Sequence, residues 1–145
     1  MTFEELNEMW AKDCKIDETN LVRESSRTPE LHSKYYNYFY REALRVRKFK
    51  ADLVELEKAK TEYYNGSMDE LELKERGWKP NPLKILRQDI QKYIESDKEI
   101  INLSLKIALH EENAKYIDSI IRQINGRNYH IKNMIDMMKF TSGGY

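Results

Sequence analysis

The feature that most constrains the fold is the stretch from residue 30 to residue 64, which contains neither glycine nor proline. Apolar and aromatic residues recur along it at steps of three and four, or sums of these steps: Tyr35, Phe39, Val46, Phe49, Leu53, Leu56 and Tyr63. This period predicts one long amphipathic helix, which needs a helical partner to cover its apolar stripe. Glu42 and Lys60 interrupt the stripe.

The ends of this helix are marked by residues that favour a start and a stop. Thr28-Pro29 predicts the N-cap and first position, where proline's missing N–H is no loss. Asn65-Gly66 predicts the end, because glycine adopts the left-handed C-cap conformation without a clash of Cβ. We therefore expect a helix over 29–64.

The clearest break in the chain is the segment 77–82, Gly-Trp-Lys-Pro-Asn-Pro, in which two prolines and a glycine oppose any regular element. We divide the chain there into 1–76, a linker over 77–82, and 83–145. Residues 101–109 alternate between apolar and polar, which is typical of a strand. Ile100, Ala108 and the flanking glutamates favour a helix instead. The predicted fold is all-α.

Composition indicates a neutral, polar protein and argues against a membrane protein. Twenty-five basic residues balance 25 acidic ones, so no global field draws the chain to nucleic acid, and any such binding must use local patches. A mean hydropathy of −0.83 is polar for a monomer but normal for a helical protein that buries surface on assembly. The lone Cys14, the lack of a long apolar run and the acidic start predict a soluble intracellular protein without a membrane span.

No motif of an enzyme is present in the sequence. The glycine-rich phosphate loop of ATPases is missing. His32, His110 and His130 are far apart in sequence and Cys14 has no partner cysteine, which makes a zinc site improbable. We expect no catalytic residue, no metal and no cofactor.

A local basic surface is nevertheless predicted on the long helix. Residues 34–50 carry a net charge of +5 interleaved with aromatic residues, and Arg41, Arg45 and Lys48 fall on one side of the helix. Its last turns carry two lysines and two tyrosines: Lys58, Lys60, Tyr63 and Tyr64. Cations beside exposed rings suit single-stranded nucleic acid, because phosphates need charge and bases need a flat partner. The alternative is a solvated helix end whose tyrosines pack into the core.

The C-terminal region predicts an assembly surface. Its apolar positions form a stripe wider than one helical partner needs, which indicates several neighbours, some of them from other subunits. The residues assigned to this seam are Ile117, Ile121, Ile124, Ile131, Met134, Ile135 and Met138.

Four short motifs resemble those of the UvsY-like recombination mediators of T4-like phages, over about residues 16–143. They are Ile16-Asp17 with Thr19 and Leu21, Ser33-Lys34-Tyr35, the run from Lys58 to Gly66, and Arg127 to Lys132 followed by Asp136-Met137. The family's central motif is Lys-Ala-Arg-x-Asp-Tyr-Tyr-Ser-Gly. Here Lys60 replaces Arg, Glu62 replaces Asp and Asn65 replaces Ser, so charge or polarity is kept. An ammonium at position 60 lacks the planar fork that binds phosphate with two bonds.

The resemblance implies an accessory protein of recombination, repair and recombination-dependent replication in the cytoplasm of an infected bacterium. Such proteins bind single-stranded DNA, form a ring-shaped homo-oligomer, and contact both the phage single-stranded-DNA-binding protein and the RecA-like recombinase that they load. Transferred to this chain, DNA binding falls on Lys58 and Lys60 in region 1–76, which also binds partners. Assembly, as a hexamer or heptamer, falls on the helix of Met134 in region 83–145.

Two other classes of function stay open on the residues alone. A helical scaffold would leave the basic face merely solvated, since such faces usually serve surface ion pairs. A protein-only adaptor would use the acidic segment 1–20, whose net charge is −4, to bind basic partners.

Overall fold

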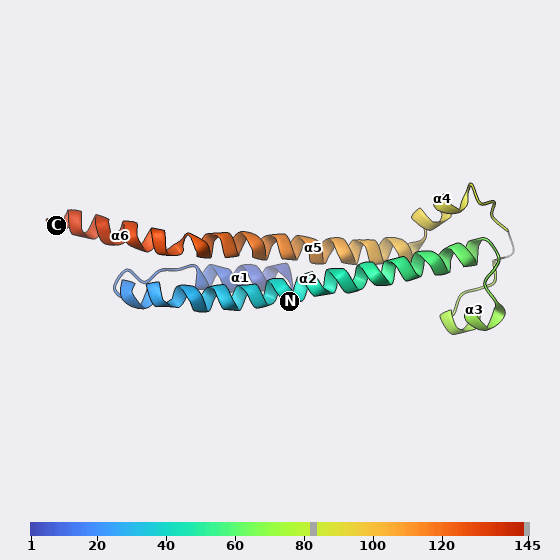
Figure 1. Ribbon diagram of the computed structural model, residues 1–145, viewed down its shortest axis with the longest axis horizontal. Coiled ribbons are helices and arrows are strands. Elements are labelled where there is room, and N and C mark those ends of the chain that lie inside the picture. Colours follow the sequence, from blue (N-terminus) through green and yellow to red (C-terminus); the bar gives the residue numbers. More distant parts are fainter. Residues whose placement is uncertain (82–83, 144–145) are drawn as a thin grey trace. The chain divides into compact units, whose positions relative to one another are not determined.

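The computed structural model describes residues 1–81 and 84–143, and within these ranges every regular element is a helix. The predicted all-α class is confirmed. The helices in chain order (Figure 1) are α1 Phe3–Asp13, α2 Leu21–Tyr64, α3 Glu70–Arg76, α4 Ile90–Glu95, α5 Lys98–Asn125 and α6 Arg127–Thr141. None of the described helices combines the length and apolar character that crossing a membrane requires.

The chain packs as two compact units. Unit 1 comprises Met1–Leu44 and Glu111–Tyr145, and unit 2 comprises Arg45–His110. Helices α2 and α5 each contribute to both units. The division 1–76, 77–82 and 83–145 concerns function along the chain and stays a prediction; its residues 82–83 and 144–145 lie outside the described residues.

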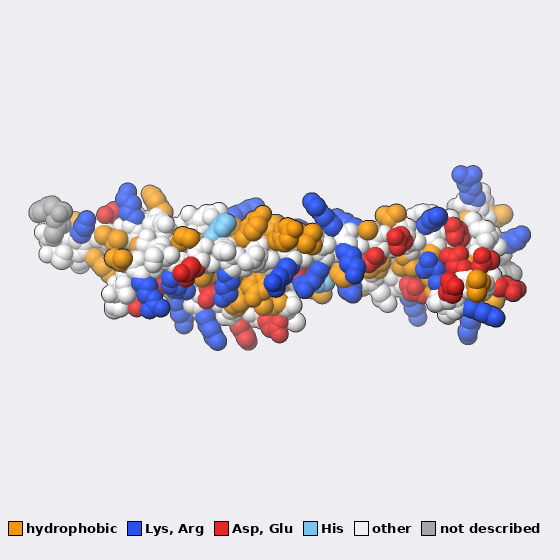
Figure 2. Space-filling model, turned by 60° about the horizontal axis from the view of Figure 1, so that its bottom comes forward, with side chains coloured by type: hydrophobic (Ala, Val, Ile, Leu, Met, Phe, Trp, Pro, Cys, Tyr) orange, Lys and Arg blue, Asp and Glu red, His pale blue; other side chains and the backbone are white. Residues whose placement is uncertain are grey.

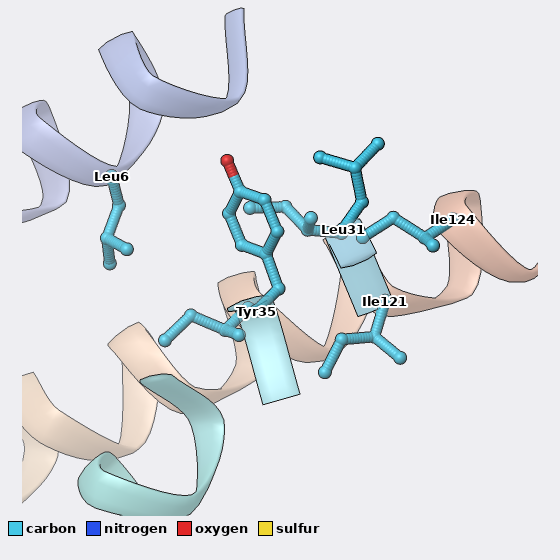
Figure 3. Packing of buried hydrophobic residues seen from close by; sticks show 7 residues of the cluster. Leu6, Leu31, Tyr35, Ile121 and Ile124 are labelled. Carbon is cyan, nitrogen blue, oxygen red and sulfur yellow. The ribbon is translucent and has the colours of Figure 1, made fainter. Parts of the chain in front are cut away.

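Unit 1 is built on an apolar core shared by three helices. Leu6 of α1 and Leu31 and Tyr35 of α2 pack against four isoleucines of α5: Ile117, Ile120, Ile121 and Ile124 (Figure 3). Tyr35 is fully buried, and its hydroxyl donates to Asp13 over 2.8 Å, which satisfies the phenol inside the core. Thr2 and Glu5 form a capping box at the start of α1.

A buried ion pair joins α2 to α6 within unit 1. The Nη2 of Arg127 lies 2.8 Å from the Oε1 of Glu24, and both side chains are about 95% buried. Arg127 also donates to the hydroxyl of Thr28 and to the carbonyl of Glu24. Arg27 pairs with the same carboxylate over 2.5 Å, and the amide of Asp17 donates to it over 2.8 Å. The carboxylate of Glu24 therefore has three partners: Arg127, Arg27 and the amide of Asp17.

The start of α2 differs from the prediction, which placed it at Thr28-Pro29. The helix begins at Leu21 and runs through Pro29. The side chain of Asn20 accepts the amide of Arg23, as an N-cap does. Thr28 does not cap the helix. Its hydroxyl donates instead to the side chain of Asn128 in α6 over 2.9 Å. Tertiary contacts from α6 thus outweigh the local preference of proline for a first turn.

Unit 2 holds a smaller apolar cluster at the end of α2. Ile90, Ile94 and Ile100 form it, with Leu53, Leu56, Tyr64 and Ile85 packed around them. The predicted end of α2 is confirmed: the helix stops at Tyr64, and Gly66 follows with a φ of 81°. Asp97 caps α5, since its Oδ1 accepts the amides of Glu99 and Ile100.

The alternating segment 101–109 is helical, as the flanking residues favoured. It lies inside α5, where Ile100 and Ile107 are buried. Three of its apolar residues, four positions apart, are exposed instead: Ile101, Leu105 and Leu109. The strand-like alternation arises because apolar residues occupy an outer face of the helix as well as the inner one.

Candidate nucleic-acid interface

The predicted basic residues of α2, apart from Lys60, are solvent-exposed. Lys58, Arg45 and Lys48 lie in unit 2, and Arg41 lies in unit 1. The face drawn in Figure 2 shows Lys and Arg side chains interleaved with hydrophobic ones. Because their charged ends reach water, phosphate can approach them from the solvent.

Lys60 is the exception among the predicted phosphate contacts. Its side chain is 6% exposed, and its ammonium lies 3.0 Å from the Oδ2 of Asp97 and 3.5 Å from the Oε1 of Glu99. The ammonium also lies 4.0 Å from the centre of the Trp78 ring. In this structure Lys60 binds carboxylates of its own chain, so its direct contact with phosphate stays a prediction.

The two tyrosines of the motif are partly buried and used within unit 2. The hydroxyl of Tyr64 donates to the Oδ2 of Asp97 over 2.5 Å, and that of Tyr63 donates to the carbonyl of Lys79 over 2.6 Å. The centre of the Tyr63 ring lies 5.3 Å from that of Trp78. These contacts hold segment 77–81 and the start of α5 against the end of α2. They match the alternative in which the tyrosines pack into the fold, and stacking on bases stays a prediction.

Asp97 is the hub of these contacts and is held as a carboxylate. Burial alone would raise the pKa of Asp97, but the hydrogen bonds from Tyr64 and Lys60 hold this pKa below its usual value. Burial, together with the hydrogen bond to Asp97, raises the pKa of Tyr64. The phenol therefore stays a donor and the carboxylate stays an acceptor at neutral pH.

Three members of this cluster were not predicted from the sequence: Trp78, Asp97 and Glu99. The indole N–H of Trp78 donates to the Oε1 of Glu99 over 2.8 Å. The guanidinium of Arg76 lies 5.1 Å from the centre of the Trp78 ring. The one available signal was Lys60, a charge on an apolar stripe, which indicates a buried counter-charge.

The residues assigned to the assembly seam fall into two groups. Ile117, Ile121, Ile124 and Ile131 are buried inside unit 1. Ile117, Ile121 and Ile124 pack in a core with α1 and α2 of the same chain, and contact of the seam with other subunits stays a prediction. Met134 is half-buried, while Ile135 and Met138 are 37% and 41% exposed.

The exposed part of the seam lies on the C-terminal turns of α6, which extend beyond the start of α2, both in unit 1 (Figure 1). Met137 and Phe140 on these turns are 65% and 83% exposed, although neither was in the predicted seam. A groove beside them is lined by Leu21 and Val22 of α2 and by Ile131 and Ile135 of α6. No group of side chains that could hold a metal ion occurs in the described ranges.

Comparison with known proteins identifies the family of the chain. Residues 9–144 match the family described as "Recombination, repair and ssDNA binding protein UvsY". None of the curated protein sequences matches the chain. Crystal structures of the recombination mediator protein UvsY of bacteriophage T4 share its fold. One, of lattice type II, has a TM-score of 0.82 at 22% identity and covers 98% of each chain.

A second crystal form of the same phage protein, lattice type IV, has a TM-score of 0.83 at 23% identity, covering 97% of this chain and 99% of the other. At such identities the likeness shows the fold, while the family match extends over nearly the whole sequence. The protein therefore belongs to the UvsY family of recombination, repair and single-stranded-DNA-binding proteins.

Proposed function

We propose that this protein is a recombination mediator, which binds single-stranded DNA and promotes loading of a RecA-like recombinase onto DNA covered by the phage single-stranded-DNA-binding protein. Membership of the UvsY family carries this proposal. It acts in the cytoplasm of the infected bacterium as a binding protein and not as an enzyme, and its partners are the DNA and those two proteins.

The exposed cations of α2 supply the DNA contacts in this proposal. Lys58 is the central one, with Arg41, Arg45 and Lys48 as further phosphate contacts, and Tyr63 and Tyr64 support the helix end beside it. A single protomer with no net charge offers few such cations, so tight binding needs several copies acting together.

Assembly through α6 supplies those copies. Met134, Ile135 and Met138, extended by Met137 and Phe140, form an apolar end that unit 1 leaves uncovered. The groove beside this end is lined by Leu21 and Val22 of α2 and by Ile131 and Ile135 of α6, so Ile135 borders both surfaces. An end that docks into the groove of the next copy makes a head-to-tail contact, which closes into a ring if the rotation allows. A hexamer or heptamer ring is the assembly we propose.

The salt dependence of oligonucleotide binding tests the DNA contacts. The logarithm of the binding constant falls with the logarithm of salt concentration, by about 0.7 for each neutralised phosphate. Lys58→Ala removes a contact in every subunit, so we expect weaker binding and a shallower slope. Lys115→Ala is the matched control, because Lys115 is also exposed but lies on α5 in unit 1. Equal slopes for the parent and Lys58→Ala would remove Lys58 from the interface.

The alternatives make different predictions in the same assay. A scaffold without a nucleic-acid role binds no oligonucleotide at any salt concentration. A protein-only adaptor binds the recombinase in the absence of DNA and fails to bind oligonucleotide. The acidic segment 1–20 gives this second alternative its support.

A further inference from the structure

The cluster around Glu99 has the chemistry of an anion-binding site that is already occupied. One carboxylate oxygen, the Oε1 of Glu99, accepts the indole N–H of Trp78 over 2.8 Å and lies 3.5 Å from the ammonium of Lys60. A neutral donor and a cation thus converge on a single anionic oxygen. All three residues belong to unit 2.

The two carboxylates beside Lys60 are held very differently. Asp97 is 8% exposed and lies closer to the ammonium, and its other oxygen caps α5. Glu99 is 52% exposed, and its side chain contacts Trp78 and Lys60. Asp97 is therefore a fixed counter-charge, whereas Glu99 is already half hydrated and can move into water without leaving a buried site.

We propose that Lys60 and Trp78 form a phosphate-binding site, which Glu99 occupies in the free protein and a phosphodiester of single-stranded DNA occupies in the complex. The exchange replaces one monoanion by another, so the charge around Lys60 is unchanged. Phosphate oxygens accept from both an ammonium and an indole N–H, as the carboxylate does. This inference rests on the proposed function for the identity of the anion.

The site also explains how a nearly buried lysine can contact DNA. Lys60 does not have to leave Asp97, because only the outer partner of its ammonium changes. The ring of Trp78, with Lys60 and Arg76 near it, stays in place beside the exchanged anion. Glu99 then lowers the affinity for DNA, because the phosphate must displace it.

The test compares the affinities of the parent, Glu99→Gln and Glu95→Gln for an oligo(dT) strand. Glutamine keeps the shape of Glu99 and an acceptor for Trp78 but removes the competing charge. Glu95→Gln is the matched control, because it changes net charge equally on α4, where Glu95 accepts a hydrogen bond from the side chain of Gln91. We expect Glu99→Gln to bind about two- to fivefold more tightly than Glu95→Gln, the size of one ion pair of this exposure.

A lower affinity of Glu99→Gln, or one equal to that of Glu95→Gln, would overturn the proposal. In that case Glu99 orders the loop or contributes only long-range charge. Thermal unfolding of both variants, followed by circular dichroism, separates a loss of folding from a loss of binding. A parent that binds no oligonucleotide would instead refute the proposed function.

Inorganic phosphate tests the site without relying on DNA. In a Trp10→Phe background Trp78 is the one remaining tryptophan, because the chain has two. We expect added phosphate to change its fluorescence, at lower concentrations in Glu99→Gln than in Glu95→Gln. A signal that does not respond to phosphate in either variant would overturn the anion site itself. A response to phosphate without oligonucleotide binding would retain the site and refute its DNA ligand.

Discussion

The two packing units each bury a basic side chain against a carboxylate, but they differ in how far the partners of that side chain are exposed to water. In unit 1 the guanidinium of Arg127 and the carboxylate of Glu24 are both about 95% buried, with Thr28 and Arg27 completing the network. In unit 2 the ammonium of Lys60 has a buried partner, Asp97, and an exposed one, Glu99. The first arrangement is suited to holding helices together, while the second leaves one contact that can be exchanged.

The largest expected effect is on the closed pair of unit 1. Arg127→Met leaves Glu24 buried with only Arg27 to balance it, and breaking a buried pair costs about 3–5 kcal/mol. We expect the free energy of unfolding to fall by about 3 kcal/mol, measured by urea denaturation at one protomer concentration. Arg122→Met is the control, because Arg122 is 79% exposed and pairs with Asp118, which is 41% exposed. Equal stabilities of the two variants would show that the buried network does not hold unit 1 together.

A comparable loss is expected where the predicted seam is buried. Ile124→Ala leaves a cavity in the core of unit 1 and lowers the free energy of unfolding by about 2–4 kcal/mol. Ile135→Ala, on the exposed end of α6, changes it by less than about 1 kcal/mol but weakens assembly. The first quantity comes from urea denaturation of a dilute sample and the second from sedimentation velocity. If Ile124→Ala altered assembly and spared stability, Ile124 would belong to a contact between subunits and not to the core of unit 1.

A smaller effect on the free energy of unfolding is expected from acid, which protonates a carboxylate in each unit. The folded protein lowers the pKa of Glu24 and of Asp97, so each contributes stability above the unfolded pKa of about 4. That stability is lost as the pH falls through the lower, folded pKa. Asp97→Asn removes the pH-dependent stability that Asp97 contributes. Below about pH 4 the free energy of unfolding of this variant should therefore depend less steeply on pH than that of the parent. Equal steepness in urea denaturation between pH 5 and pH 2 would exclude Asp97 as a source of acid sensitivity.

The smallest effect is expected at the turn after α2. Gly66 has a φ of 81°, and a Cβ at this position would lie 3.3 Å from the Cγ of Lys84. Gly66→Ala should cost about 1 kcal/mol, because a side chain disfavours this backbone conformation. Gly126→Ala is the control, since its φ is −87° and nothing lies closer than 3.7 Å to the added atom. Thermal unfolding of the two variants should differ by a few degrees.

The sequence was most informative where pattern and local chemistry agree. The long helix, its end at Gly66 and the capping box of α1 follow from periodicity and end signals, which act within a few residues. The start of α2 was predicted at the wrong residue, because Thr28 bonds to Asn128 of α6, about a hundred residues away, instead of capping the helix. A signal read from neighbours in sequence cannot report such a contact.

The candidate site was predictable in part for the same reason. Lys58 and Arg41 could be placed on an outer helix face by spacing alone, and both are exposed. The surroundings of Lys60 depend on Trp78 and Glu99, which only the folding of unit 2 brings to it. The burial of Ile117 and Ile124 likewise depends on which helices cover α5, and a wide apolar stripe does not distinguish a partner in the same chain from one in another.

The proposed mechanism has DNA held by an array of protomers gathered through the exposed end of α6. Its most direct test is the single-stranded DNA affinity of Met134→Asp with Met138→Asp, beside the mass of the protein in solution. The control pair is Asn125→Asp with Asn133→Asp, which adds the same charge at exposed positions. We predict a monomer that binds oligonucleotide at least about a hundredfold more weakly than the control oligomer. A stable monomer with the affinity of the parent would contradict the account.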